Sequence, residues 1–176
     1  MIPTTLPEVG QAAPLRVALV EDNEDVRLMM GEVLETWGHE VSQAATGALG
    51  VQLIIEQCPD IAFIDIGLPD MDGYELARQV RARLPSPGPM LVALSGFGQR
   101  RDRERASLAG FDDHLAKPAS PVDLKRLLHE ARRGRARDEA AQNGLDTRVP
   151  ITRTTLKEDE NGQQHGERPR EAFGER

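Results

Sequence analysis

The feature that most constrains how this chain folds is a regular alternation of short apolar runs with segments of helical periodicity. The apolar runs occupy residues 16–20, 39–44, 61–64, 90–94 and 113–116, and the run at 61–64 is the most hydrophobic. Short, continuous, β-branched runs are typical of strands buried on both faces of a sheet. The segments between them repeat apolar residues every three or four positions, as amphipathic helices do. Five strands alternating with five helices predict an α/β fold with a doubly wound parallel sheet and right-handed crossovers.

Polar residues follow the apolar runs at the points where the predicted strands end. Glu21 and Asp22 follow the first run, Asp65 the third, Ser95 the fourth and Lys117 the fifth. The carboxyl ends of parallel strands meet at one edge of an open α/β sheet, and ligands bind at that edge. We therefore expect these five side chains to lie close together.

Three carboxylates at short range repel one another unless they share a cation or retain a proton. A hard, oxygen-seeking ion such as Mg²⁺ resolves this conflict, and the backbone carbonyl of Gly67 offers a further oxygen ligand. The Lys117 ammonium suits a phosphoryl oxygen, and the Ser95 hydroxyl offers a hydrogen-bond donor. The set predicts metal-assisted phosphoryl transfer to Asp65, without the general base that rapid turnover requires.

Several other classes of protein are disfavoured. The first βα turn lacks the glycines of a dinucleotide site, and no Walker A sequence occurs. The net charge of −7 argues against general nucleic-acid binding, and the arginines between residues 100 and 105 alternate with acids, as on a solvated helix face. No run approaches the length of a membrane span. A single cysteine permits no internal disulfide, which fits a cytoplasmic protein. From the charge and the lack of a long apolar run, we expect that the protein binds neither nucleic acid nor membranes directly.

The two ends of the chain differ from its middle. Residues 1–14 contain three prolines and little periodicity, which is typical of a flexible leader. Residues 15–133 carry the alternating pattern and form the predicted domain. Residues 134–176 are rich in charge, and they have too few large apolar side chains to offset the entropy of ordering. We expect a disordered tail there, with some extension of the last helix through Ala136, and this tail is too short and polar for a DNA-binding effector domain.

Four segments, in this order, resemble the motifs of response-regulator receiver domains of two-component phosphorelays, most closely those associated with hybrid histidine kinases. The resemblance covers residues 15–133 and implies a flavodoxin-like receiver fold. The segments are Leu19-Val20-Glu21-Asp22-Asn23, Ile64-Asp65-Ile66-Gly67-Leu68-Pro69-Asp70-Met71-Asp72-Gly73, Ala93-Leu94-Ser95-Gly96 and His114-Leu115-Ala116-Lys117-Pro118.

The resemblance implies separate roles for the site residues. Asp65 would accept a phosphoryl group from a phosphohistidine on a sensor histidine kinase or a histidine phosphotransfer protein. Asp22, Asp65 and the Gly67 carbonyl would bind Mg²⁺, with Glu21 assisting through water. Ser95 and Lys117 would contact the phosphoryl oxygens, with a cis peptide bond following the lysine.

The same resemblance implies a switch that is read by partner proteins. The switch positions are Ser95, where the family often has Thr, and His114, where it often has Tyr or Phe. A downstream protein would bind the face formed by the helix at 100–109, the strand at 113–116 and the last helix, and a homodimer is an open alternative. The downstream partner itself is not predicted.

Two other functions compete with this hypothesis. A haloacid-dehalogenase-type aspartyl-phosphate phosphatase would need a second carboxylate two residues after Asp65, where this chain has Gly67. A pure interaction module would never be phosphorylated, which leaves the complete set of site residues unexplained. We therefore expect a phosphoacceptor with at most slow self-dephosphorylation, rather than an enzyme.

Overall fold

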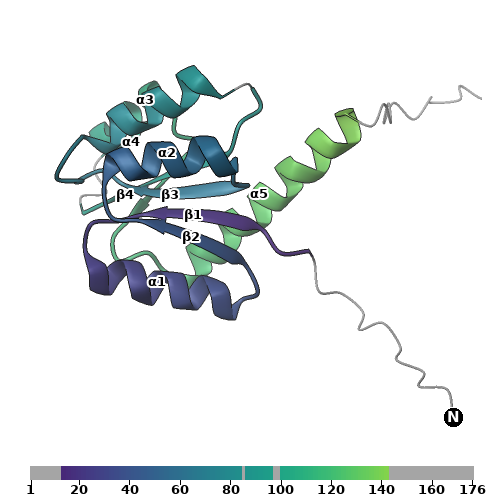
Figure 1. Ribbon diagram of the computed structural model, residues 1–176, viewed down its shortest axis with the longest axis horizontal. Helices are drawn as coiled ribbons and strands as arrows, with labels where there is room; N and C mark the ends of the chain where they lie inside the picture. Colours follow the sequence, from purple (N-terminus) through teal and green to yellow (C-terminus); the bar gives the residue numbers. More distant parts are fainter. Residues whose placement is uncertain (1–12, 85, 97–99, 143–176) are drawn as a thin grey trace, which may run out of the picture. The chain divides into compact units, whose positions relative to one another are not determined.

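Five parallel strands form one sheet in the computed structural model, which describes residues 13–84, 86–96 and 100–142 (Figure 1). The strand order is β2-β1-β3-β4-β5, so the predicted doubly wound α/β fold is confirmed. The run at 39–44, only half of which is apolar, lies at one edge of the sheet as β2. The most hydrophobic run, at 61–64, lies at the centre as β3. The strands are β1 (Arg16–Val20), β2 (Glu40–Ala44), β3 (Ile61–Asp65), β4 (Met90–Ser95) and β5 (Asp113–Ala116).

Helices cover both faces of this sheet (Figure 1). One face packs against α1 and α5 through a core that includes Leu34, Phe63 and Leu127. The other face packs against α2, α3 and α4, and its core includes Ile54 and Leu76. No helix within the described ranges is long and apolar enough to cross a membrane. The helices are α1 (Glu24–Thr36), α2 (Gly47–Gln57), α3 (Gly73–Arg83), α4 (Arg100–Ala109) and α5 (Pro121–Gln142).

Local signals in the sequence account for where several helices begin and end. The Asn23 side chain accepts a hydrogen bond from the backbone N–H of Val26 at 3.1 Å and caps α1. Gly38 follows α1 with φ of 84°, a left-handed conformation that glycine adopts without strain. Asp72 caps α3 in the same way, accepting from the N–H of Tyr74 at 3.0 Å. Both capped helix starts lie just after the strand ends that carry the polar residues.

The last helix is longer than the sequence interpretation placed it. The predicted extension of the last helix ends at Ala136, whereas α5 continues to Gln142 and extends past the end of the sheet (Figure 1). Residues 135–142 lack large apolar side chains for a core, but their Ala, Arg, Glu and Gln residues have high helix propensity. Arg135 and Glu139, one turn apart, also form an ion pair at 2.8 Å. Residues 1–12 of the predicted leader and 143–176 of the predicted tail lie outside the described residues.

Asp60, immediately before β3, ties α5 to the amino-terminal ends of two strands. Its carboxylate accepts a hydrogen bond from the backbone N–H of Arg16 at 2.7 Å and lies 3.4 Å from the Arg135 guanidinium. The side chain is only 7% exposed. Because the removal of a buried acceptor leaves its donors unsatisfied, this carboxylate contributes to stability as well as to the placement of α5.

We expect Asp60→Ala to lower the free energy of unfolding by about 1–3 kcal/mol, because the Arg16 N–H and the Arg135 guanidinium lose a buried partner. Urea unfolding followed by circular dichroism measures the change. Glu139→Ala is the matched control, since it removes only the exposed partner of Arg135 and is expected to cost less than about 0.5 kcal/mol. Equal losses in the two variants would contradict the role given to Asp60.

Candidate functional site

The register of the sheet brings the polar strand ends to one edge. Val20 of β1 pairs with Ile64 of β3, so the residues that follow, Glu21 and Asp65, lie side by side. Asp65 pairs in turn with Leu94 of β4, which places the next residue of that strand at the same edge. Buried apolar side chains set the register of the parallel strands. This register positions the acids without any contribution from the acids themselves.

Three carboxylates form an acidic cluster at this edge. One oxygen from each of Glu21, Asp22 and Asp65 lies within 4.8 Å of the others. Glu21 and Asp65 are buried, whereas Asp22 is exposed. A carboxylate cluster that is open on one side suits a hard divalent cation that keeps some of its water ligands. Gly67 lies beside the cluster, since its N–H donates to Asp65 Oδ1 at 3.1 Å.

Lys117 supplies the compensating positive charge from the end of β5. Its Nζ lies 2.5 Å from Glu21 Oε2 and 2.9 Å from Asp65 Oδ2. Burial lowers the pKa of Lys117, but the hydrogen bonds and negative charges of Glu21 and Asp65 outweigh burial and raise the pKa above its ordinary value. The ammonium therefore stays charged in the site. The peptide bond between Lys117 and Pro118 is cis, as the resemblance implies.

Ser95 and His114 contact each other inside the protein. The Ser95 Oγ lies 2.6 Å from His114 Nε2, and both residues are buried. Ser95 also accepts a hydrogen bond through its backbone carbonyl from the N–H of Lys117 at 2.7 Å. The two residues predicted as switch positions are thus in direct contact, next to the strand end that carries Lys117.

The other two acids of the loop after β3 have structural contacts instead. Asp70 accepts hydrogen bonds from the N–H groups of Gly47 at 2.7 Å and Ala48 at 2.9 Å, at the start of α2. The bonds from Ala48 and Gly47 lower the pKa of Asp70. Asp72 caps α3, as described above. Gly73 closes the loop so tightly that a Cβ there would lie 2.5 Å from the Asp65 backbone oxygen.

Sequence reasoning missed Arg27, which borders the acidic cluster from α1. Its Nη1 donates to the carbonyl oxygen of Glu21 at 2.8 Å and lies 3.4 Å from that of Asp22. The guanidinium thereby holds the loop from which both acids project. The sequence does show that Arg27 is the only basic residue within α1. It does not show that the Arg27 side chain points toward the loop that carries Glu21 and Asp22.

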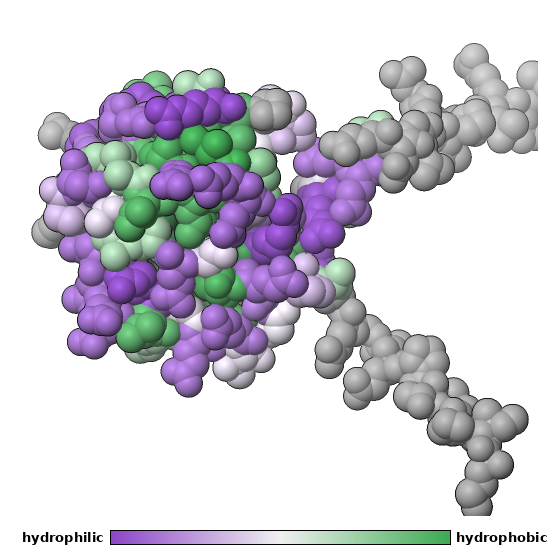
Figure 2. Space-filling model, in the orientation of Figure 1, coloured by the Kyte–Doolittle hydropathy of each residue, from purple (hydrophilic) through white to green (hydrophobic). Residues whose placement is uncertain are grey.

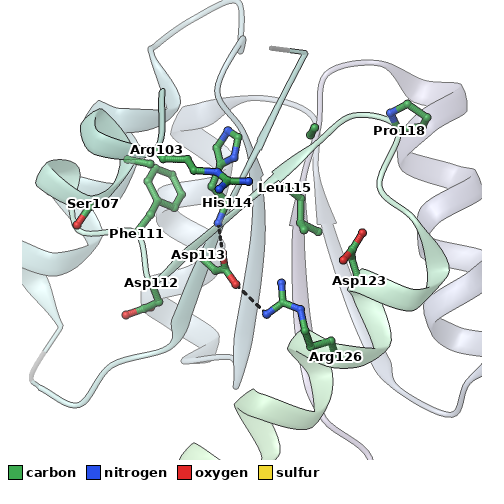
Figure 3. A pocket seen from close by; sticks show the side chains of 12 residues that line it. Arg103, Ser107, Phe111, Asp112, Asp113, His114, Leu115, Pro118, Asp123 and Arg126 are labelled. Atoms are coloured by element: carbon green, nitrogen blue, oxygen red, sulfur yellow. Dashed lines mark hydrogen bonds and ion pairs between the residues drawn. The ribbon is translucent and has the colours of Figure 1, made fainter. Parts of the chain in front are cut away.

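A cavity of about 720 Å³ opens on the face formed by α4, β5 and α5 (Figure 3). His114 reaches its wall from β5, and Arg103 extends toward it from α4 (Figure 3). On the α5 side, Arg126 forms an ion pair with Asp113 at 3.0 Å. Because His114 also contacts Ser95, one residue links this cavity to the edge of the sheet that carries Asp65.

Comparisons with known proteins agree with this arrangement. Residues 17–129 match the family described as "Response regulator receiver domain". An uncharacterized 14.6 kDa protein of Leptolyngbya boryana is 30% identical over 118 residues, which cover 67% of this chain and 90% of that protein. Other curated relatives are longer, and the chain spans only 10% of the virulence sensor protein BvgS of Bordetella bronchiseptica, to which it is 32% identical.

Solved structures with the same fold include receiver domains. The receiver domain of sensor histidine kinase PA1611 from Pseudomonas aeruginosa, determined with a magnesium ion in its active-site cleft, is 32% identical, with a TM-score of 0.62 over 68% of this chain and 98% of that chain. The receiver domain of Saccharomyces cerevisiae Ssk1, solved with the histidine phosphotransfer protein Ypd1, is 27% identical, with a TM-score of 0.59 over 64% of this chain and 84% of that chain. By its family match and its fold, the chain belongs to the response regulator receiver domain family.

Proposed function

We propose that this chain is a phosphoacceptor of a two-component phosphorelay and that Asp65 accepts the phosphoryl group. The observation that carries the proposal is the position of Asp65, which is buried beside two further carboxylates while its Oδ2 lies 2.9 Å from the Lys117 ammonium. A buried carboxylate that contacts an ammonium group and belongs to a cluster able to hold a metal ion is arranged to receive a phosphoryl group. The ammonium and the metal ion would both offset the negative charge of the arriving group.

The transfer forms a bond between an Asp65 carboxylate oxygen and phosphorus and breaks the bond between phosphorus and the donor imidazole nitrogen. The freed imidazole of the sensor histidine kinase or histidine phosphotransfer protein takes up a proton. Mg²⁺, bound by Asp22, Asp65 and the Gly67 carbonyl, would offset charge on the phosphoryl oxygens. Glu21 would act on the metal through water, which is compatible with its direct ion pair to Lys117.

The phosphoryl oxygens also give Lys117 and Ser95 new partners. A Ser95 hydroxyl that turns toward the phosphoryl group gives up its 2.6 Å contact with His114. His114 lines the cavity between α4, β5 and α5, so this change reaches the face on which we place a downstream protein. The switch thus rests on a hydrogen-bonding histidine rather than on the Tyr or Phe that is frequent in the family.

We assign the receiver domain to residues 15–133, with the rest of α5 continuing beyond it. A receiver domain is generally a phosphoacceptor rather than a true enzyme, and we infer at most slow self-dephosphorylation here. A phosphatase of the haloacid dehalogenase type is disfavoured because Gly67 stands where that class has its acid–base carboxylate. A module that is never phosphorylated is disfavoured by the position of Lys117 against Asp65.

Incubation with radiolabelled acetyl phosphate and Mg²⁺ tests the proposal. We expect label that is lost at alkaline pH, as an acyl phosphate is, and no label when EDTA removes the metal. Sustained release of phosphate from simple phosphate esters would favour the phosphatase instead. Labelling that EDTA leaves unchanged would contradict the metal-assisted mechanism.

A further inference from the structure

Asp22 is the least restrained of the three acids in the cluster. The Glu21 carboxylate contacts the Lys117 ammonium at 2.5 Å. The Asp65 carboxylate contacts the same ammonium at 2.9 Å and also accepts a hydrogen bond from the N–H of Gly67 at 3.1 Å. Asp22 is exposed, and no hydrogen bond or ion pair within the described ranges holds its carboxylate. The direction of this carboxylate therefore depends on the backbone that carries it.

Arg27 of α1 holds that backbone. Its Nη1 donates to the carbonyl oxygen of Glu21 at 2.8 Å and lies 3.4 Å from the carbonyl oxygen of Asp22. These two carbonyls belong to the peptide units on either side of Asp22, and no other side chain among the described residues donates to them. A hydrogen bond from a charged donor is stronger than one between neutral groups, and the guanidinium is half-buried, so water screens it only in part.

The stability of α1 does not explain a cation at this position. Arg27 is the fourth residue of the helix, near the N-terminus, where the partial positive charge of free N–H groups favours acids over bases. Glu24 and Asp25 in the same turn follow this rule. Arg27 also has no carboxylate at ion-pair distance in the part of the chain that the structure describes. The contacts that it does make are with the loop that carries the acids, and they indicate a role there.

We propose that Arg27 is a positioning residue for Mg²⁺ and that it acts by fixing the direction of Asp22. The inference rests on the metal of the proposed function, which Asp22, Asp65 and the Gly67 carbonyl would bind. A ligand that is already oriented binds a metal more tightly, because less conformational freedom is lost on binding. The charge of Arg27 acts in the opposite direction, since a cation near the cluster repels Mg²⁺. Positioning and charge thus predict opposite changes in Mg²⁺ affinity when the arginine is removed.

Titration of the full chain with Mg²⁺, followed through backbone amide resonances by NMR, measures this affinity directly. We expect Arg27→Met to raise the dissociation constant for Mg²⁺ by about 10- to 100-fold, as the loss of a partner that orients a metal ligand does. Arg83→Met is the matched control, because it removes the same charge from an exposed arginine at the far end of α3, and it should leave the constant unchanged. An unchanged or lowered constant in Arg27→Met, or an equal rise in the control, would overturn the proposal.

Arg27→Lys is the second variant. Lysine keeps the positive charge, but its side chain is one bond shorter and lacks the planar fork of the guanidinium. We expect a rise in the dissociation constant that is smaller than the rise in Arg27→Met. Circular dichroism checks that each variant is folded. Where the Met variant does not fold, an unchanged Mg²⁺ affinity in the Lys variant overturns the proposal.

Labelling by acetyl phosphate at several Mg²⁺ concentrations separates a role toward the metal from a role toward the phosphoryl group. Arg27→Met should need about 10- to 100-fold more Mg²⁺ for half-maximal labelling, yet approach the rate of the unmodified chain once Mg²⁺ saturates. A rate that stays low at saturating Mg²⁺ would contradict the proposal, because Arg27 would then act on the phosphoryl group or its donor. An unmodified chain that binds Mg²⁺ but takes up no label would overturn the proposed function and leave the role of Arg27 in Mg²⁺ binding intact.

Discussion

Replacing Asp65 by Asn is expected to abolish labelling by acetyl phosphate in the presence of Mg²⁺. The substitution keeps the shape of a buried side chain but removes the negative oxygen that attacks phosphorus. Glu21 and Asp22 remain in this variant, so label that persists would point to one of these two carboxylates instead. We expect the labelling rate to fall by at least about 10²-fold, measured by incorporation of radiolabelled phosphate.

Asp70→Asn is the matched control for this experiment. Asp70 lies in the same loop and undergoes the same chemical change, but its carboxylate caps α2 at Gly47 and Ala48. An Asn side chain still accepts a hydrogen bond at a helix N-terminus, so the fold is retained. We expect labelling close to that of the unmodified chain. Equal labelling of the Asp65 variant and the unmodified chain would exclude Asp65 as the acceptor.

The parts of the site that the sequence could predict are those set by local pattern. Strands and helices follow from periodicity, and polar residues at strand ends must gather at one edge once the strands are parallel. Glu21, Asp22 and Asp65 meet for this reason alone. The position of Asp72 as the cap of α3 also follows from a local rule, because a short polar side chain before a helix bonds to its free N–H groups.

Contacts between distant residues could not be read from the sequence. The ion pair between Glu21 and Lys117 spans 96 positions, and the sequence alone does not say which of three acids the ammonium contacts. The hydrogen bond between Ser95 and His114 depends on a rotamer that only the packing of β4 beside β5 fixes. The sequence indicated some extension of the last helix through Ala136, but α5 continues to Gln142, because helix propensity there outweighs the lack of large apolar residues.

Replacing Lys117 by Met should impair both phosphoryl transfer and stability. Labelling should slow by about 10²- to 10³-fold, because the variant lacks a preorganised cation at the phosphoryl oxygens. The free energy of unfolding without metal should fall by about 1–3 kcal/mol, since Glu21, whose side chain is 2% exposed, loses its ion-pair partner. Mg²⁺ should then raise the melting temperature of the variant more than that of the unmodified chain, because the metal takes over the neutralising charge.

The pH dependence separates this charge effect from simple loss of packing. The pKa of Lys117 is raised in the folded protein, so the stability that its charge contributes is fully present below the ordinary lysine pKa of about 10.4 and is lost only as pH rises through the raised value. The stability difference between the unmodified chain and Lys117→Met should therefore be constant across neutral pH and shrink only in strong alkali. Lys125→Met, the same change at the α5 lysine that contacts Trp37, should leave labelling and its metal dependence unaltered. If Lys125→Met slows labelling as much, or if Lys117→Met labels normally, the ammonium at Asp65 has no part in the transfer.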